Sequence, residues 1–152
     1  MTGFRICNTT YADDISGRGA KLYGGRWNSA GFPMLYLGEH ISLCAVELLV
    51  HLQPKDKSTA FALLNIDWPD AAKTTAINPA KLKRNWHNDI AYTRFMGDEF
   101  IKDKSSLLMK VPSAIIPDEF NFLANPLHPD FKKIKISKSR EFLFDDRLFA
   151  FK

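Results

Sequence analysis

Four prolines in the last third of the chain limit what this sequence can fold into. Proline lacks a backbone N–H and its ring clashes with the preceding helical turn, so a long helix does not pass through it. Pro112, Pro117, Pro126 and Pro129 follow one another at short intervals and exclude a long helix there. The apolar runs around them are typical of short strands. We expect these strands over 106–113, 119–125, 132–137 and 141–145.

The rest of the chain mixes strand and helix patterns, with helices in the middle and strands toward both ends. This distribution predicts an α+β fold. The length of 152 residues and the hydrophobic content of 45% fit a single domain over 1–152 with a core of its own. The further elements we expect are strands over 4–7, 33–38 and 59–68 and helices over 42–52 and 87–102, the first of these helices buried on most sides.

A long irregular segment, 13–31, is punctuated by glycines and runs directly into a strand. Turn chemistry accounts for its glycines and for Asn28, but not for Arg26 and Trp27 between them. Long loops in small domains are more often functional than idle. Glycine N–H groups and the planar fork of Arg26 would suit a phosphate, although no common phosphate-binding fingerprint is present. The alternative is a connector whose arginine caps a helix or pairs with a surface acid.

Glu47 is an acidic residue in an otherwise apolar helical stretch, CAVELLV. A carboxylate there needs a partner, a wet cleft or a raised pKa, so Glu47 is either a site residue or half of a structural ion pair. Only residues 39–41 join this helix to the strand before it, which lets Tyr36 of that strand lie close by. Ser113 follows a proline at a strand break, where its hydroxyl could simply satisfy a bent backbone.

Composition argues against several classes of protein. No segment approaches the roughly 20 apolar residues of a membrane span, and no secretory signal is visible, so we expect a cytoplasmic protein with reduced Cys7 and Cys44. The histidines lack ligand-like spacing with cysteines or acids, and no metal site is expected. The net charge of +4 permits an anionic partner. The basic run 131–140 lacks a nucleic-acid recognition motif and fits a strand with a solvated lysine face.

Seven motifs follow one another along nearly the whole chain: GRGAKLYGGRWNSAG, MLYLGEHISLCAVELLVHL, LKRNW, MGDEF, LLMKVPSAIIP, NFLANPLHPDF and FLFDDRLF. In this order they resemble the RES-domain family of bacterial toxins, which is named for an arginine, a glutamate and a serine. The most specific combination is GGRWN followed by Tyr36 and a helical glutamate. By this resemblance the three named residues are Arg26, Glu47 and Ser113. Phe100 departs from the pattern, since tryptophan is expected there.

The resemblance implies a fold similar to that of ADP-ribosyltransferase toxins, built from small mixed sheets with flanking helices, and a substrate, NAD, with no other cofactor. Breaking the nicotinamide–ribose bond passes through an oxocarbenium-like state. Because the pyridine nitrogen is already cationic, the leaving group needs no general acid, and one carboxylate suffices. We therefore expect Arg26, Tyr36 and Glu47 as catalytic residues, with the Tyr36 ring against the nicotinamide. The expected substrate-binding residues are Gly25, Arg26, Trp27, Asn28, Tyr36 and Ser113.

The expected partners are NAD and a cognate Xre-type antitoxin with a helix-turn-helix domain, with no membrane and no direct nucleic-acid contact. A homodimer is left open. The acceptor is open too: water would make a glycohydrolase, phosphate a phosphorylase and a protein side chain an ADP-ribosyltransferase. Two alternatives are not enzymes. One is a basic module that binds nucleic acid, and the other is an inactive scaffold that only engages an antitoxin.

Overall fold

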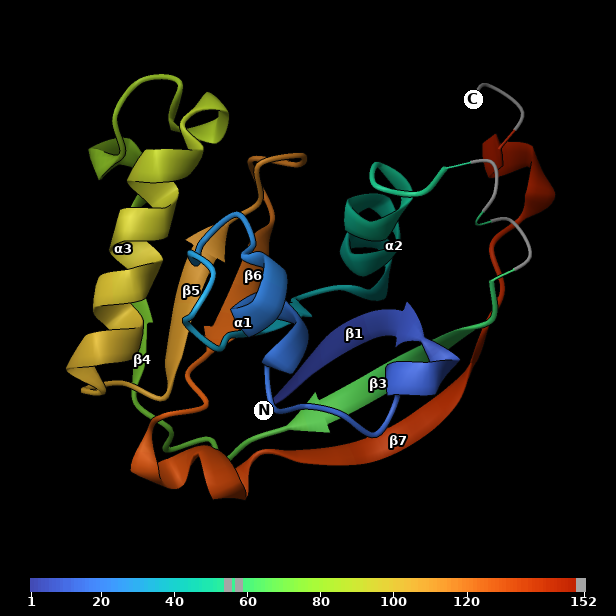
Figure 1. Cartoon of the computed structure of the whole chain (residues 1–152), viewed down its shortest axis with the longest axis horizontal. Coiled ribbons are helices and arrows are strands. Elements are labelled where there is room, and N and C mark those ends of the chain that lie inside the picture. The colour runs from blue at the N-terminus through green and yellow to red at the C-terminus, as the bar shows by residue number, and fades with distance from the viewer. Residues whose placement is uncertain (54–55, 57–58, 150–152) are drawn as a thin grey trace.

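The computed structural model describes residues 1–53, 56 and 59–149 and has a seven-stranded sheet in the order β4-β5-β6-β2-β1-β3-β7 (Figure 1). Neighbouring strands are antiparallel except β4 and β5, which are parallel. The strands are β1 Thr2–Asn8, β2 Leu35–Gly38, β3 Phe61–Asp67, β4 Thr74–Ala76, β5 Leu108–Pro112, β6 Phe120–Ala124 and β7 Lys135–Phe142.

Three α-helices and several short 3-10 helices accompany the sheet in the described residues. The α-helices are α1 Arg18–Tyr23, α2 Ile41–Leu49 and α3 Ile90–Asp103. None of the helices in this part of the chain combines the length and the apolar character that a membrane span requires. The 3-10 helices are Thr9–Tyr11, Pro79–Lys81, Trp86–Asn88, Pro129–Lys133 and Asp146–Phe149.

The predicted α+β class is confirmed, but the strands form one sheet instead of several small ones. The last two expected strands are one strand, β7, because the polar run between them lies on the exposed edge beside β3. The exposed strand β4 and the short helix α1 were missed, since neither has a buried residue. Helix α2 is less buried than expected: of its residues, only Leu43 is fully buried.

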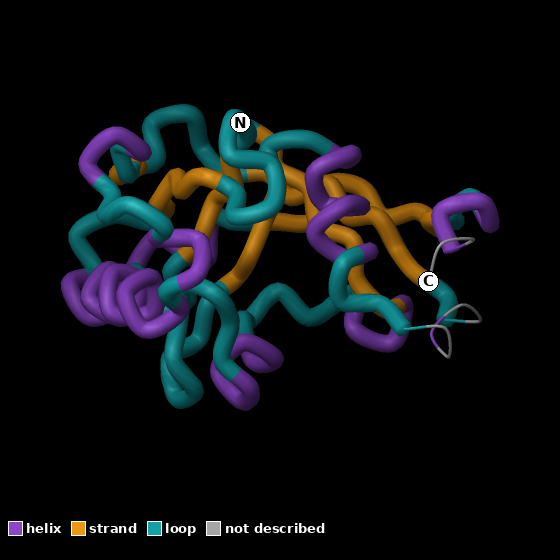
Figure 2. The backbone as a smooth tube through the Cα atoms, turned by 90° about the horizontal axis from the view of Figure 1, so that it is seen from above, coloured by secondary structure: helices purple, strands orange, loops and turns teal. Residues whose placement is uncertain are grey.

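Both faces of the sheet carry apolar clusters, which explains why β3 reads as a nearly continuous apolar run. Leu63 packs in a cluster with residues of α2, whereas its neighbours Leu64 and Ile66 pack on the opposite face. On the α2 side a further cluster joins α3 to strands β5 and β6. Helices α2 and α3 lie well apart in both views (Figure 1, Figure 2). The central strand β2 therefore presents Tyr36 on the face that the two helices share.

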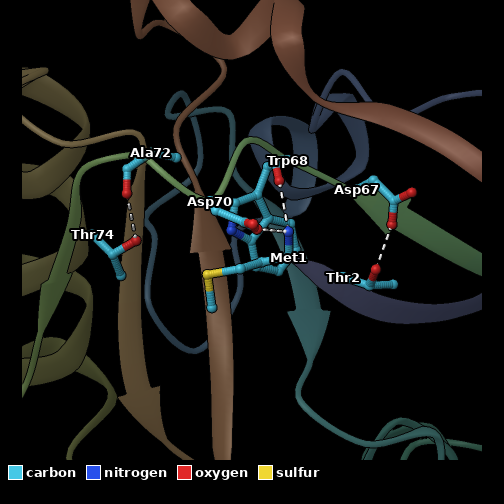
Figure 3. A network of polar contacts seen from close by, with 7 residues as sticks. All are labelled: Met1, Thr2, Asp67, Trp68, Asp70, Ala72 and Thr74. Atoms are coloured by element: carbon cyan, nitrogen blue, oxygen red, sulfur yellow. Dashed lines mark hydrogen bonds and ion pairs between the residues drawn. The ribbon is translucent and has the colours of Figure 1, made fainter.

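Polar contacts at the start of β1 and the end of β3 hold these two strands together (Figure 3). The Thr2 hydroxyl donates to Asp67 at 2.6 Å, in agreement with the register that pairs these two residues. The Met1 amine donates to the Trp68 carbonyl at 2.9 Å and pairs with Asp70. These contacts hold β1 and β3, two inner strands of the sheet, in register with each other.

Candidate active site

The GGRWN loop, residues 24–28, is fastened to helix α3 by side chains of that helix. α3 begins with a side-chain cap, because Asp89 accepts a hydrogen bond from the Tyr92 N–H. Residues in its next turns form three hydrogen bonds with the backbone of the loop and of Ser29. The Thr93 hydroxyl donates to the Arg26 carbonyl at 2.6 Å, Arg94 Nε donates to the Gly25 carbonyl at 2.8 Å, and the Ser29 N–H donates to Asp98 at 2.8 Å.

Gly97 lets the loop approach α3 this closely. A Cβ at position 97 would lie 1.6 Å from the Trp27 carbonyl oxygen, a distance that no side chain tolerates. The Trp27 side chain is only 3% exposed and packs at a tilt against Trp86, with ring centroids 5.7 Å apart. Trp27 therefore anchors the loop in the core, and its expected contact with substrate stays a prediction.

Asn28 and Tyr36 fix the other side of the loop. Asn28 is fully buried and its amide nitrogen donates to the carbonyls of Ala20, Ser29 and Phe32. Its amide oxygen accepts from the Tyr36 hydroxyl at 2.7 Å, and that hydroxyl accepts from the Trp27 N–H at 3.0 Å. The protein itself uses both ends of the Asn28 amide and the Tyr36 hydroxyl. Only the ring of Tyr36 is left for a ligand.

We expect Tyr36→Phe to destabilise the protein. The change leaves the buried Asn28 oxygen without its donor and the Trp27 N–H without its acceptor, at about 1–3 kcal/mol for each unsatisfied group. Chemical denaturation of the wild type and the variant measures this loss in the free energy of unfolding. Tyr23→Phe is the control, because Tyr23 is 83% exposed. Equal unfolding curves for Tyr36→Phe and the wild type would contradict the anchoring role of the hydroxyl.

The carboxylate of Glu47 is held by two neutral donors. Ser113 Oγ donates to its Oε1 at 2.7 Å, and Asn121 Nδ2 donates to the same oxygen at 2.8 Å. Ser113 is fully buried, and its hydroxyl also accepts from the N–H groups of Ile115 and Ile116 at 3.0 Å each. Within the described part of the chain both side-chain bonds of Glu47 reach Oε1, which leaves Oε2 for a ligand.

The alternative role of Glu47, half of a structural ion pair, has no support in the described residues. No lysine or arginine there lies within ion-pair distance of its carboxylate. Hydrogen bonds from neutral donors orient a carboxylate without neutralising its charge. Glu47 is thus a half-buried group whose negative charge is available to a bound cation.

Two cavities meet at Glu47, since both are lined by this residue and by His51. The smaller, of about 230 Å³, is lined also by Tyr36 and Asn121. The larger, of about 440 Å³, is lined also by Gly25, Arg26, Arg94 and Ile115. Together they reach the size range typical of ligand sites. The structure thus brings Arg26, Tyr36 and Glu47 together, with Glu47 at the junction, while Ser113 lies behind Glu47.

Cys44 lines the smaller cavity, but it is not prepared to act as a nucleophile. Its thiol donates to the Phe4 carbonyl at 3.2 Å, and burial raises its pKa to about 12. Burial likewise raises the pKa of the Tyr36 hydroxyl, against the opposing charges of Arg94 and Arg26. Because the thiolate is the reactive form of cysteine, Cys44 is inert near neutral pH.

We therefore expect Cys44 in a Cys7→Ser background to react with a disulfide reagent at pH 8 far more slowly in the folded protein than in guanidinium. The unfolded thiol ionises near its ordinary pKa of 9.0, whereas the folded thiol keeps its proton to about pH 12. The unfolded state therefore binds fewer protons between these values, and stability falls as the pH rises through that window. Equal reaction rates in the folded and unfolded protein would contradict this environment.

Sequence reasoning missed Asn121 and Arg94. Asn121 lies in β6 opposite Val111 of β5, and its signal was a lone amide in the otherwise apolar run EFNFLAN. Arg94 gave no signal, because an arginine on an amphipathic helix is ordinarily a solvated residue. Only the packing of α3 against the loop turns it inward, to the cavity that Arg26 also lines.

The fold and the site define a single α+β domain with a carboxylate at the junction of two cavities. The chain belongs to the RES-domain family, whose RES domain matches residues 2–145. The resemblance drawn from the sequence motifs is thereby confirmed.

Curated relatives and a solved structure agree with this membership. "Toxin Res" of Pseudomonas putida (strain KT2440) is 40% identical over 143 residues, covering 93% of this chain and 96% of that protein. "Prs ADP-ribosylating toxin" of Sphingobium sp. (strain YBL2) is 37% identical over 144 residues, covering 92% and 89%. A chain of the crystal structure of the M. tuberculosis MbcT–MbcA toxin–antitoxin complex shares the fold, with a TM-score of 0.77 at 22% identity over 93% of this chain and 84% of that one.

Proposed function

We propose that this chain is a toxin that cleaves the nicotinamide–ribose bond of NAD. One observation carries the proposal: the Glu47 carboxylate, held by Ser113 and Asn121, is shared by a smaller cavity lined by Tyr36 and Arg5 and a larger cavity lined by Arg26 and Arg94. NAD offers an aromatic ring for Tyr36 at one end of the nicotinamide riboside and a diphosphate for the larger cavity at the other. The bond between ring and ribose would then lie beside Glu47.

In this reaction Glu47 stabilises positive charge. As the bond breaks, positive charge grows on the ribose, and a fixed carboxylate in a cavity stabilises it more than water does. Hydrogen bonds from two neutral groups orient Glu47 in advance without cancelling its charge. The Tyr36 ring packs against the nicotinamide in the smaller cavity, and Arg26 binds phosphate in the larger one.

The relatives support the toxin role and the use of NAD. One is named as an ADP-ribosylating toxin and others as Toxin Res, and each aligns with most of this chain. ADP-ribosylation requires cleavage of the same bond, with a protein side chain as acceptor. Water and phosphate are the other acceptors that this site could use, and the products distinguish the three.

We also propose that a cognate Xre-type antitoxin restrains this enzyme. An enzyme that consumes NAD harms the cell in which the enzyme is produced. The enzyme therefore needs a partner that blocks its active site. A complex with an antitoxin, in which the structural neighbour was solved, supports this partnership. Expression of this chain alone should arrest growth, and co-expression with the antitoxin gene beside its own should restore it.

The direct test is the release of nicotinamide. Purified protein is incubated with NAD in phosphate-free buffer, in phosphate buffer and with cell extract, and the products are separated by chromatography. We expect free nicotinamide in at least one of the three, with ADP-ribose, its 1″-phosphate or labelled protein identifying the acceptor. Folded protein that releases no nicotinamide with any acceptor would contradict the proposal.

A further inference from the structure

The larger cavity holds a second guanidinium besides that of Arg26. Arg94 comes from α3 and lines the same cavity, and both side chains are half-buried. Each uses one nitrogen on a backbone carbonyl: Arg94 Nε on Gly25 and Arg26 Nη1 on His87, both at 2.8 Å. A guanidinium has five N–H donors, so most donors of both groups are unused by these bonds.

Neither arginine is neutralised by an acid in the described part of the chain. The ion pairs found there involve other residues, and Asp98, one turn beyond Arg94, is bound to the Ser29 N–H. Among the described residues that line the larger cavity, Glu47 is the acidic one. Partly buried charges of one sign cost free energy unless an opposite charge joins them. Two such cations against one carboxylate leave an excess of positive charge in the cavity, which favours an anionic ligand.

We propose that Arg94 is a second substrate-binding residue, which together with Arg26 holds the diphosphate group of a dinucleotide in the larger cavity. A guanidinium fork binds two phosphate oxygens at once, and two forks match the two phosphates. That the ligand is a dinucleotide rests on the proposed function, whereas the diphosphate site is inferred from the two arginines alone. A diphosphate held here places the attached riboside toward Glu47 and the smaller cavity.

The bond from Arg94 to the Gly25 carbonyl sets a requirement for the test, because loss of that bond could loosen the loop. Arg94→Gln keeps a side-chain N–H for the Gly25 carbonyl and removes the charge. Thr93→Val is the matched control: it removes the neighbouring hydrogen bond to the Arg26 carbonyl and leaves every charge in place. Thermal melting of each preparation reports whether the fold is retained.

The experiment is calorimetric titration of the wild type and both variants with inorganic pyrophosphate, ADP-ribose and nicotinamide riboside. We expect Arg94→Gln to weaken pyrophosphate and ADP-ribose binding about tenfold or more, since a charge-assisted contact is lost. Nicotinamide riboside has no phosphate, so its binding should be unchanged. Thr93→Val should weaken pyrophosphate and ADP-ribose binding less than Arg94→Gln does, because both guanidinium charges remain.

Several outcomes would overturn the inference. They are a wild type that does not bind pyrophosphate, an Arg94→Gln protein that binds it as the wild type does, and equal losses in Arg94→Gln and Thr93→Val. Kinetics keep the two proposals apart. If the wild type cleaves NAD and Arg94→Gln has the same KM for NAD, the role of Arg94 is wrong, whereas the proposed reaction is supported. Charge-dependent pyrophosphate binding without NAD cleavage supports the diphosphate site and defeats the proposed reaction.

Discussion

Replacement of Glu47 by glutamine is expected to lower kcat for NAD cleavage about a hundredfold or more, while the affinity for NAD changes little. The amide oxygen can still accept from Ser113 and Asn121, so the side chain keeps its place. What disappears is the negative charge, which matters most when the ribose becomes cationic. Preorganised electrostatic groups of this kind typically contribute factors of a hundred to a thousand to kcat.

Turnover, NAD binding and thermal melting should be measured on the same preparations of Glu47→Gln and the wild type. Glu99→Gln is the matched control, because Glu99 is an exposed glutamate on α3 that pairs with Lys102. Its turnover should equal that of the wild type. A Glu47→Gln protein that melts normally, binds NAD and cleaves it at the wild-type rate would defeat the catalytic role.

The second large effect concerns stability and lies at Gly97. We expect Gly97→Ala to reduce the free energy of unfolding by at least the 1–3 kcal/mol typical of overpacked cores. The added methyl would meet the Trp27 carbonyl, a backbone atom that moves only if the loop moves. Activity should fall as well, because the displaced loop carries Gly25 and Arg26.

Chemical denaturation measures this change, and Gly19→Ala provides the control. Gly19 is in helix α1, where nothing lies within 4 Å of an added Cβ. Alanine also favours a helix over glycine by up to about 1 kcal/mol, so Gly19→Ala should keep or raise the stability. If Gly97→Ala unfolded at the wild-type denaturant concentration, the close packing of loop and helix would be wrong.

The sequence predicted the elements that bury apolar residues and missed two that bury none. Strand β3 was found because its apolar residues are nearly continuous, and helix α3 because its apolar residues recur at helical spacing. Strand β4 and helix α1 have no buried residue, so their periods were invisible. A short helix inside the glycine-rich segment needs turns at both ends, which Gly17 and Gly24 supply with φ of 74° and 72°.

Two charged residues of the candidate site, Glu47 and Arg26, were predictable from the sequence, whereas Arg94 and the supporting residues were not. Glu47 attracted attention because a carboxylate is costly in an apolar helix, and Arg26 because turn chemistry does not require it. Asn28 was expected to bind substrate through the family resemblance; its amide braces the loop, and its contact with substrate stays a prediction. Contacts between residues far apart in the chain, such as Asn121 with Glu47, depend on which strands become neighbours. Local patterns do not contain that information.

The bound position of NAD can be tested directly by a crystal structure of Glu47→Gln soaked briefly with NAD, since this variant should bind NAD and cleave it about a hundredfold or more slowly. We expect the nicotinamide–ribose bond beside residue 47, the nicotinamide against the Tyr36 ring and the diphosphate within hydrogen-bonding distance of Arg26. NAD bound away from the two cavities, or with its diphosphate at the Tyr36 end, would contradict the proposed role of Glu47.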